Sequence, residues 1–246
     1  MTIIKVIAEK NKCYQAGGVL HPQGIMLHSV GCAQPSAAVF ARSFNQYQPG
    51  GQSVCVHAVA QADGTVYQLL PWEMRGWHCG GSANSTHIGV EMTEPSAGMT
   101  RSEAAEQIAG TYRTVVELFA ELCKQYELDP AQDGVIIGHA EGHRRGVASN
   151  HADPELLWRT YDMGYTMDGF RRDVAEAMKN GAREEALDMP RYDSVAEMPQ
   201  WARADAQRLI DRGALQGNTD GKLDVSEDML RTMIVCQRMV DEQKET

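Results

Sequence analysis

The apolar positions of the first 180 residues switch repeatedly between strand-like and helix-like spacing. Short apolar or alternating runs, which predict buried and half-buried strands, cover residues 24–30, 53–61, 65–70, 86–93 and 134–138. Helical spacing of about 3.6 residues occurs in residues 35–46, 100–126, 154–161 and 167–180. Because strands and helices interleave, the pattern predicts an α/β domain with a mixed β-sheet flanked by helices.

Two local signals mark the ends of particular elements. Ala62-Asp63-Gly64 separates two strand-like runs and predicts a β-hairpin, because Asp-Gly favours a tight turn. Thr100 and Glu103 form a T-x-x-E capping box, which predicts the start of a long helix with one buried apolar stripe. We expect this helix to end before Asp129-Pro130, since proline disfavours helical backbone at the residue before it.

The remainder of the chain has a different pattern. Residues 181–197 are charged and show no apolar period, so they predict a linker. Two short helical patterns follow, at about 198–212 and 226–243. The predicted organisation is therefore a domain of residues 1–180, a linker of residues 181–197 and a small C-terminal helical module of residues 198–246.

Composition and charge exclude several classes of partner. The chain has 246 residues with 23 Lys and Arg against 33 Asp and Glu, a net charge of −10, which argues against nucleic acid as a partner. No run approaches the roughly 20 apolar residues that span a bilayer, so we expect no membrane partner. The N-terminal segment is too charged for a signal peptide, and we expect synthesis in the cytoplasm. The six cysteines include no CxxC pair of the kind found in zinc ribbons.

All eight histidines lie within the first 151 residues, which places any imidazole chemistry in the first domain. His28 and His139 each end a predicted apolar strand, and His151-Ala152-Asp153-Pro154 follows. A catalytic zinc ion needs three protein ligands, most often imidazole nitrogen or carboxylate oxygen, with one position open for water. Taken together, these segments indicate a metal site.

Five segments carry a family resemblance: MLHSVG around His28, GWHCGG at 76–81, IGVEM at 88–92, GHAEGH at 138–143 and HADP at 151–154. In this order they resemble the zinc-dependent N-acetylmuramoyl-L-alanine amidases of type 2, which include phage amidase endolysins and peptidoglycan-recognition proteins. The resemblance covers roughly residues 1–165. It implies a mixed sheet flanked by helices, a zinc cofactor and hydrolysis of the bond between the lactyl group of N-acetylmuramic acid and L-alanine in bacterial peptidoglycan.

The resemblance also assigns metal ligands. It makes His28 and His139 the first two zinc ligands and Asp153, immediately before proline, the third. The loop before Asp153 is longer than in shorter family members, so His151 is a rival third ligand. His151 also occupies the position where many members carry a lysine that stabilises the oxyanion, and a hydrogen-bonding imidazole can serve that purpose.

The remaining family positions concern proton transfer and the substrate. Glu91 matches the glutamate that deprotonates water and protonates the leaving amine. Val56 stands where some relatives have a tyrosine, which leaves proton transfer to Glu91. Trp77, His78 and Gly80 match a segment along the substrate cleft and are expected to bind substrate.

The HAEGH segment, Glu141 and His57 are interpreted from their own sequence context, without the family resemblance. HAEGH lacks the glutamate that would follow the first histidine of a metalloprotease helix, and Gly142 argues against a helix there. Glu141 is expected to orient a ligand or the loop rather than to take part in chemistry. His57 lies on an internal strand and is expected to pack or to support a ligand indirectly.

The C-terminal module resembles one S-layer homology motif, with a sound helix start at Ser226. Its basic residue is missing, because this chain reads Ser-Glu-Asp-Met at 226–229, so wall binding and self-association both remain open. We therefore expect an endolysin-like zinc amidase that acts on the cell wall after release by phage lysis or cell lysis. The alternative is a noncatalytic peptidoglycan-binding protein, but that reading predicts a missing zinc ligand.

Overall fold

The computed structural model describes residues 1–46, 54–188 and 190–244. Residue 53, the first of the predicted run 53–61, lies outside these ranges, as do the last two residues of the predicted C-terminal module. The chain divides into two compact units, residues 1–180 and 181–246. Within the described ranges, no helix is long and apolar enough to cross a membrane.

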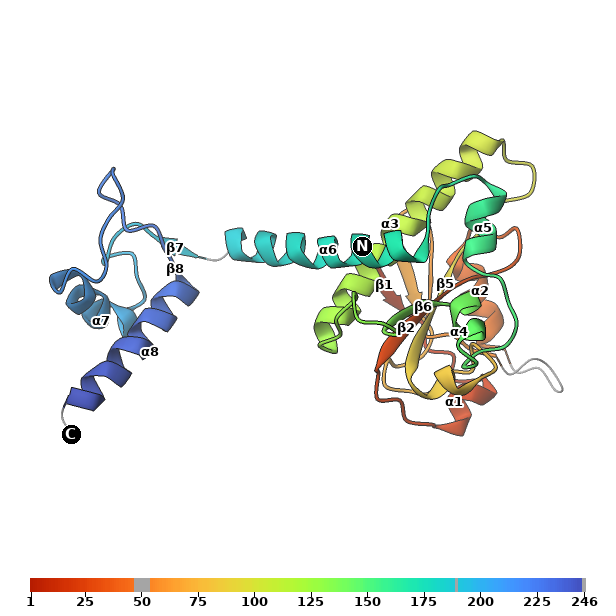
Figure 1. The fold of residues 1–246 in the computed structure, drawn as a ribbon, viewed down its shortest axis with the longest axis horizontal. Helices are drawn as coiled ribbons and strands as arrows, with labels where there is room; N and C mark the ends of the chain where they lie inside the picture. The colour runs from red at the N-terminus through yellow and green to blue at the C-terminus, as the bar shows by residue number, and fades with distance from the viewer. Residues whose placement is uncertain (47–53, 189, 245–246) are drawn as a thin grey trace. The chain divides into compact units, whose positions relative to one another are not determined.

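The first unit is built on a six-stranded sheet with the order β1-β4-β3-β5-β2-β6 (Figure 1). The strands are β1 (Thr2–Lys5), β2 (Gly24–Ser29), β3 (Ala58–Ala60), β4 (Thr65–Gln68), β5 (His87–Met92) and β6 (Ile136–Gly138). β3 and β4 pair antiparallel across the predicted hairpin, and the other neighbouring pairs are parallel. The predicted mixed sheet is therefore confirmed. The exception is β1, which the sequence did not predict, because Ile3 and Ile4 form only a short apolar run in this mostly exposed edge strand.

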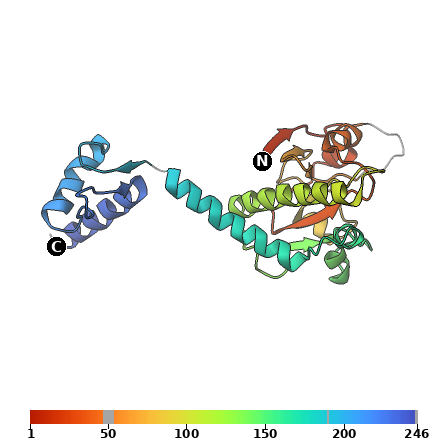
Figure 2. The same cartoon turned by 90° about the horizontal axis from the view of Figure 1, so that it is seen from above.

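Helices cover both faces of this sheet. They are α1 (Lys12–Ala16), α2 (Ala37–Phe44), α3 (Arg101–Gln125), α4 (His139–Arg144), α5 (Glu155–Thr160) and α6 (Met167–Asp188), with a 3₁₀ turn η1 (Ser82–Ser85). Ala58 and Ala60 join one core with α3 and α6, whereas Val59 joins a second core with α1 and α2. Successive residues of a strand point to opposite faces, so the two cores lie on opposite sides. Figure 2 shows α3 and α6 side by side, where Phe119 and Phe170 meet edge-on at 5.0 Å between ring centroids.

The long helix α3 begins as the sequence predicted. The Thr100 backbone N–H donates to Glu103 Oε2 at 2.8 Å, and the Glu103 N–H donates to Thr100 Oγ1 at 3.3 Å. This reciprocal capping box satisfies two backbone donors that a helix start otherwise leaves without partners. The apolar stripe from Ile108 to Cys123 is buried against the sheet, which confirms the predicted amphipathic helix.

Helix α4 contradicts one expectation from the sequence. The sequence predicted no helix in HAEGH because of Gly142, but residues His139–Arg144 are helical. A Cβ atom at Gly142 would lie 2.9 Å from Met26 Cε and 3.0 Å from Ala148 Cβ. The glycine is thus explained by close packing of the helix on β2 and the following loop, and its modest helix-propensity cost of about 1 kcal/mol is tolerated.

The predicted linker also differs from the structure at its start. Residues 181–188 continue α6, although the sequence predicted a linker over 181–197. Their segment Ala-Arg-Glu-Glu-Ala-Leu-Asp at 182–188 is rich in strong helix formers, which sustain a helix without an apolar stripe. The expectation failed because it relied on apolar periodicity alone.

In the described part of the second unit, the end of α6 is followed by two helices and a short antiparallel pair of strands. Its elements are β7 (Arg191–Tyr192), α7 (Gln200–Asp211), β8 (Val225–Ser226) and α8 (Glu227–Lys244). Leu209, Leu230 and Ile234 belong to a core of its own. Ser226 Oγ accepts a hydrogen bond from the Met229 backbone N–H at 3.3 Å, as expected of a helix start. The predicted small helical module is confirmed as structure, and its likeness to an S-layer homology motif stays a prediction.

Candidate active site

Three adjacent parallel strands place the candidate catalytic and metal-binding side chains at the same end of the sheet. The central β2 pairs with β5 on one side and β6 on the other. His28 and Glu91 are register partners on β2 and β5, so their side chains share a face. His139 directly follows Gly138, the last residue of β6. Parallel strands end at the same edge, which explains how residues far apart in sequence come together.

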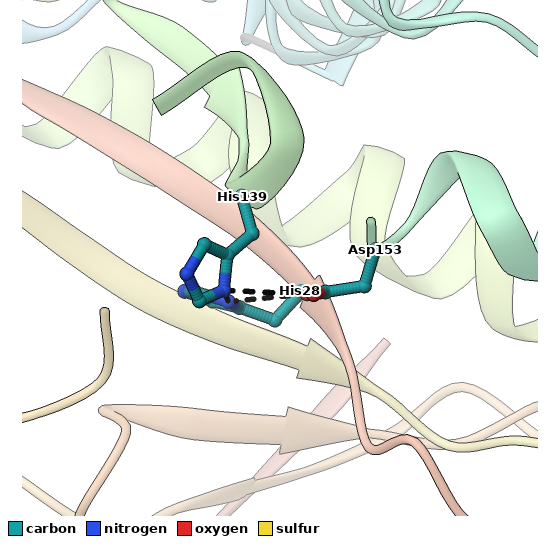
Figure 3. Close-up of side chains that lie close together, drawn as sticks. All are labelled: His28, His139 and Asp153. Carbon is teal, nitrogen blue, oxygen red and sulfur yellow. Dashed lines mark hydrogen bonds and ion pairs between the residues drawn. The ribbon is translucent and has the colours of Figure 1, made fainter. Parts of the chain in front are cut away.

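His28, His139 and Asp153 form one compact group (Figure 3). The Nδ1 atoms of the two histidines are 3.0 Å apart. Asp153 Oδ2 lies 3.3 Å from His28 Nδ1, and Asp153 Oδ1 lies 3.5 Å from His139 Nδ1. One potential ligand atom from each residue lies within 4.8 Å of the others, which makes this a candidate metal centre.

The charge balance of this group follows from burial and hydrogen bonding. Burial lowers the pKa of His28, because the imidazolium form loses its hydration, and this favours the neutral ring that metal binding requires. Burial alone would raise the pKa of Asp153, but its hydrogen bonds to His139 and His28 outweigh burial and lower that pKa. The group therefore combines a carboxylate with an imidazole that burial keeps neutral.

Glu91 lies beside this group in a cavity of about 770 Å³ whose lining also includes His28, His139 and Asp153. Its Oε2 atom is buried and has no hydrogen-bond partner among the residues that the structure describes. Burial raises the pKa of the Glu91 carboxyl well above its usual range, and the charges of Asp153 and Glu94 raise it further. A buried carboxyl without partners, next to a candidate metal centre, is suited to proton transfer.

His151 lies at the same cavity but outside the three-residue group. Its Nδ1 atom is 3.1 Å from Ser149 Oγ, and its ring centroid is 4.5 Å from that of His139. The side chain is exposed, so the ring can face a bound molecule. Of the two rivals for third ligand, the geometry groups Asp153 with the two histidines.

The predicted substrate residues occupy three different environments. Gly80 is exposed, lines the cavity and has a φ of 63°, a conformation that favours glycine. His78 also lines the cavity, but it is buried, with both ring nitrogens in hydrogen-bond contacts. Trp77 packs against the second core and is not among the described residues that line the cavity. Substrate contact by these residues stays a prediction.

Glu141 and His57 have clear supporting contacts. Glu141 Oε2 accepts from the Gly138 N–H at 3.2 Å, and the same carboxylate pairs with Arg171 at 2.9 Å. It therefore holds the start of α4, and with it His139, against α6. His57 Nε2 lies 2.7 Å from the Met74 carbonyl oxygen, its Nδ1 accepts from the Gly89 N–H, and burial lowers its pKa to about 4.

Sequence reasoning missed two residues beside the site, Ser149 and Glu94. Ser149 Oγ donates to the Cys79 carbonyl oxygen at 3.0 Å and lies 3.3 Å from His139 Nε2. Glu94 Oε1 accepts from Ser29 Oγ at 2.8 Å and from the Gly31 N–H at 2.9 Å, which fixes the turn after β2. Neither residue belongs to a quoted motif, because their partners lie on other elements.

Comparisons with known proteins agree with this picture. The family model described as N-acetylmuramoyl-L-alanine amidase matches residues 18–156. The Staphylococcus aureus hydrolase AmiA, solved with its ligand, is similar with a TM-score of 0.59 and 19% identity over 75% of this chain and 86% of that one. The catalytic domain of XlyA (TM-score 0.53, 21% identity) and a mutant endolysin from Bacillus subtilis (0.52, 20%) each match over 71% of this chain and 99% of theirs. No curated protein sequence matches.

Proposed function

Because this chain belongs to the N-acetylmuramoyl-L-alanine amidase family, we propose that it is a zinc hydrolase acting on bacterial peptidoglycan. The bond cleaved is the amide between the lactyl group of N-acetylmuramic acid and L-alanine. One observation carries the proposal: His28, His139 and Asp153 converge on one point of a cavity that also holds the unpartnered carboxyl of Glu91.

The donor set fits a zinc ion. Two imidazole nitrogens and one carboxylate oxygen leave the fourth position open, as catalytic zinc sites require. The two histidine Nδ1 atoms are 3.0 Å apart, and each lies within 3.5 Å of one oxygen of the Asp153 carboxylate, so one ion could contact all three residues. Zinc at such a site lowers the pKa of a coordinated water from ~15.7 toward ~7 and polarises a carbonyl group.

Glu91 is the residue that we assign to proton transfer. Its Oε2 atom would accept a proton from the water that attacks the amide carbonyl. The same atom would return that proton to the L-alanine nitrogen as the carbon–nitrogen bond breaks. The products are the lactyl carboxylic acid and a free amine, so every atom of the water is accounted for. The unpartnered and buried state of Oε2 supports this role, because no internal hydrogen bond must be broken first.

His151 is the residue that we assign to the developing oxyanion. Ser149 Oγ donates its only hydrogen to the Cys79 carbonyl oxygen, so its contact with His151 must be one in which it accepts from His151 Nδ1. The other ring nitrogen, His151 Nε2, is then available to the substrate. With a hydrogen on Nε2 as well as on Nδ1, the ring would donate from Nε2 to the carbonyl oxygen of the substrate.

The proposal extends to the rest of the chain. Residues 1–180 would form the catalytic domain, with Trp77, His78 and Gly80 along the substrate path. The second unit would bind the cell wall or self-associate, and its own compact core supports a separate role. We propose that the protein reaches the wall through phage lysis or cell lysis.

Digestion of purified cell walls tests the activity. The full chain should release L-alanine amino ends, detected by mass analysis, and a chelator or His28→Ala should stop the release. Walls incubated with Trp201→Ala, a change on the surface of the second unit, should still be cut at the same bond. Products without new L-alanine amino ends would overturn the proposal and favour a noncatalytic binding protein.

The identity of the third ligand needs a separate measurement. Zinc content should fall in Asp153→Ala and stay near one ion per chain in His151→Ala, because only Asp153 lies in the compact group. The His151 variant should instead lose activity with its zinc in place. Loss of zinc from the His151 variant alone would show that His151 is the third zinc ligand and that Asp153 is not.

A further inference from the structure

A second layer of hydrogen bonds lies behind the candidate metal ligands. His28 Nε2, the nitrogen on the far side of the ring from Asp153, is 2.9 Å from His78 Nδ1. The two rings meet edge-on, with centroids 5.1 Å apart and an angle of 79° between their planes. On its other side, His78 Nε2 lies 3.1 Å from the carbonyl oxygen of His87. The three groups form a continuous chain from the backbone of β5 to the metal centre.

This chain fixes which nitrogens carry hydrogen. A carbonyl oxygen can only accept, so His78 Nε2 must be the donor to His87. Buried His78 is neutral and carries one ring hydrogen, so its Nδ1 is an acceptor and His28 Nε2 must donate to it. The single ring hydrogen of a neutral His28 is then on Nε2. Its Nδ1 is left as a bare lone pair that faces His139 and Asp153.

This assignment applies to the metal-bound ring. In the metal-free protein, a hydrogen on His28 Nδ1 can instead be donated to Asp153, whose Oδ2 lies 3.3 Å away. His78 Nδ1 would then have to donate to His28 Nε2, and His78 Nε2 would have no hydrogen for the His87 carbonyl oxygen. A metal ion on His28 Nδ1 would remove this alternative, because the ring hydrogen must then be on Nε2, where His78 Nδ1 accepts it.

The same logic holds independently at the second ligand. Ser149 Oγ donates its only hydrogen to the Cys79 carbonyl at 3.0 Å. Its lone pairs therefore accept from His139 Nε2, 3.3 Å away. His139 Nδ1 is then bare and points toward His28 Nδ1. Both rings thus present Nδ1 to one point, each held from behind through Nε2.

The protein backbone is shaped to hold His78 in this place. A Cβ atom at Gly89, in the middle of β5, would lie 2.4 Å from His78 Cγ and 2.7 Å from its Nδ1. Asn84 Oδ1 accepts from the backbone N–H groups of His78 and Cys79, at 2.8 and 3.0 Å. The glycine of the I-G-V-E segment thus makes room for the ring, and Asn84 fixes the backbone that carries it.

We propose that His78 is a positioning residue that holds His28 as the Nε2–H tautomer and so prepares His28 Nδ1 to bind the metal. Outer partners of this kind fix both the tautomer and the direction of a ligand ring. This inference rests on the metal centre of the proposed function. It gives His78 a role behind the ligand in place of the expected contact with substrate.

Zinc affinity, measured by competition with a coloured chelator, is the first test. His78→Phe removes the acceptor and should weaken zinc binding by about 10- to 100-fold. His78→Asn should recover most of the affinity, since its Oδ1 can accept in place of Nδ1. Tyr112→Phe is the control, because that ring is also buried and loses a single hydrogen bond, from its hydroxyl to Asp173, away from the ligands. Wild-type affinity in His78→Phe, or no recovery in His78→Asn, would overturn the proposal.

The tautomers can be read without activity. Nitrogen-15 spectra of the zinc-loaded full chain should show His28 Nε2 and His78 Nε2 protonated and His78 Nδ1 bare, with a coupling through the hydrogen bond between His28 Nε2 and His78 Nδ1. A protonated His78 Nδ1 would refute the inference even if the variants fail to fold. If the wild-type protein binds no zinc, the proposed function fails, whereas a protein that binds zinc with His78 Nδ1 protonated overturns this inference alone.

Discussion

Replacement of Glu91 by glutamine separates a catalytic carboxyl from a structural one. The substitution keeps the size and shape of the side chain and removes only its charge and its ability to move a proton. Among the described residues, Glu91 Oε2 is buried without a hydrogen-bond partner, and the charges that raise its pKa are the carboxylates of Asp153 and Glu94. Activity and stability should therefore change in opposite directions.

The loss of activity follows from the role in proton transfer. General acid–base catalysis contributes about 100- to 10,000-fold, which corresponds to about 3–5 kcal/mol at the transition state. Because glutamine still fills the same space beside the ligands, zinc content and zinc affinity should stay close to those of the wild-type protein. We expect kcat to fall by this factor with little change in bound zinc.

The gain in stability follows from burial. Burial penalises a charged carboxylate more than a neutral amide of the same shape, and repulsion from the carboxylates of Asp153 and Glu94 adds to that penalty for Glu91. In metal-free protein at neutral pH, Glu91→Gln should therefore be more stable by about 1 kcal/mol. A raised folded-state pKa destabilises the protein above the unfolded-state pKa, so the gain should vanish below about pH 4.5, where both states are protonated.

The assay combines wall digestion with thermal unfolding of the metal-free protein at neutral and acidic pH. A structural ion pair at Glu91 would reverse the sign, because its removal destabilises the protein. The reasoning is refuted if Glu91→Gln lowers the melting temperature at neutral pH, or if kcat falls by less than tenfold while zinc stays bound.

Three further outcomes follow from the structure. Gly89→Ala should weaken zinc binding at least tenfold by chelator competition, since its Cβ would displace His78; unchanged affinity would contradict this. Gly110→Ala should lower stability by about 1–3 kcal/mol in thermal unfolding, despite the better helix propensity of alanine, because its Cβ would lie 2.7 Å from the Ala62 carbonyl oxygen. Zinc at about 100 times its Kd should stabilise the protein by about 2.7 kcal/mol, and an equal shift in His28→Ala would argue against the proposed site.

Local chemistry explains why much of the fold was predictable. The capping box of Thr100 and Glu103, the hairpin at Ala62-Asp63-Gly64 and the apolar stripe of α3 each depend on residues within a few positions of one another. The elements that the sequence did not predict depend on contacts between distant parts of the chain. Gly142 lies in a helix although glycine disfavours one, and Met26 and Ala148 explain the glycine because they leave no room for a larger side chain. Such packing between elements leaves no local pattern in the sequence.

The candidate site divides in the same way. The sequence indicated His28, His139 and Asp153 as a group, through strand ends and a family resemblance. It left His151 as a rival, because the loop before Asp153 is longer than in shorter family members. The structure groups Asp153 with the two histidines and leaves His151 at the cavity wall. This outcome depends on backbone geometry that brings together residues 111 positions apart.

By itself the sequence determined the α/β order, the small helical module and the residue types able to bind a metal, since these follow from short-range pattern and chemical identity. Tertiary structure alone decided which nitrogen of each histidine faces the metal site. That choice depends on the His87 carbonyl behind His78 and on Ser149 behind His139, contacts that form only when separate strands and loops pack together. A ring nitrogen acquires its role from its neighbours in space, and spacing along the chain does not specify them.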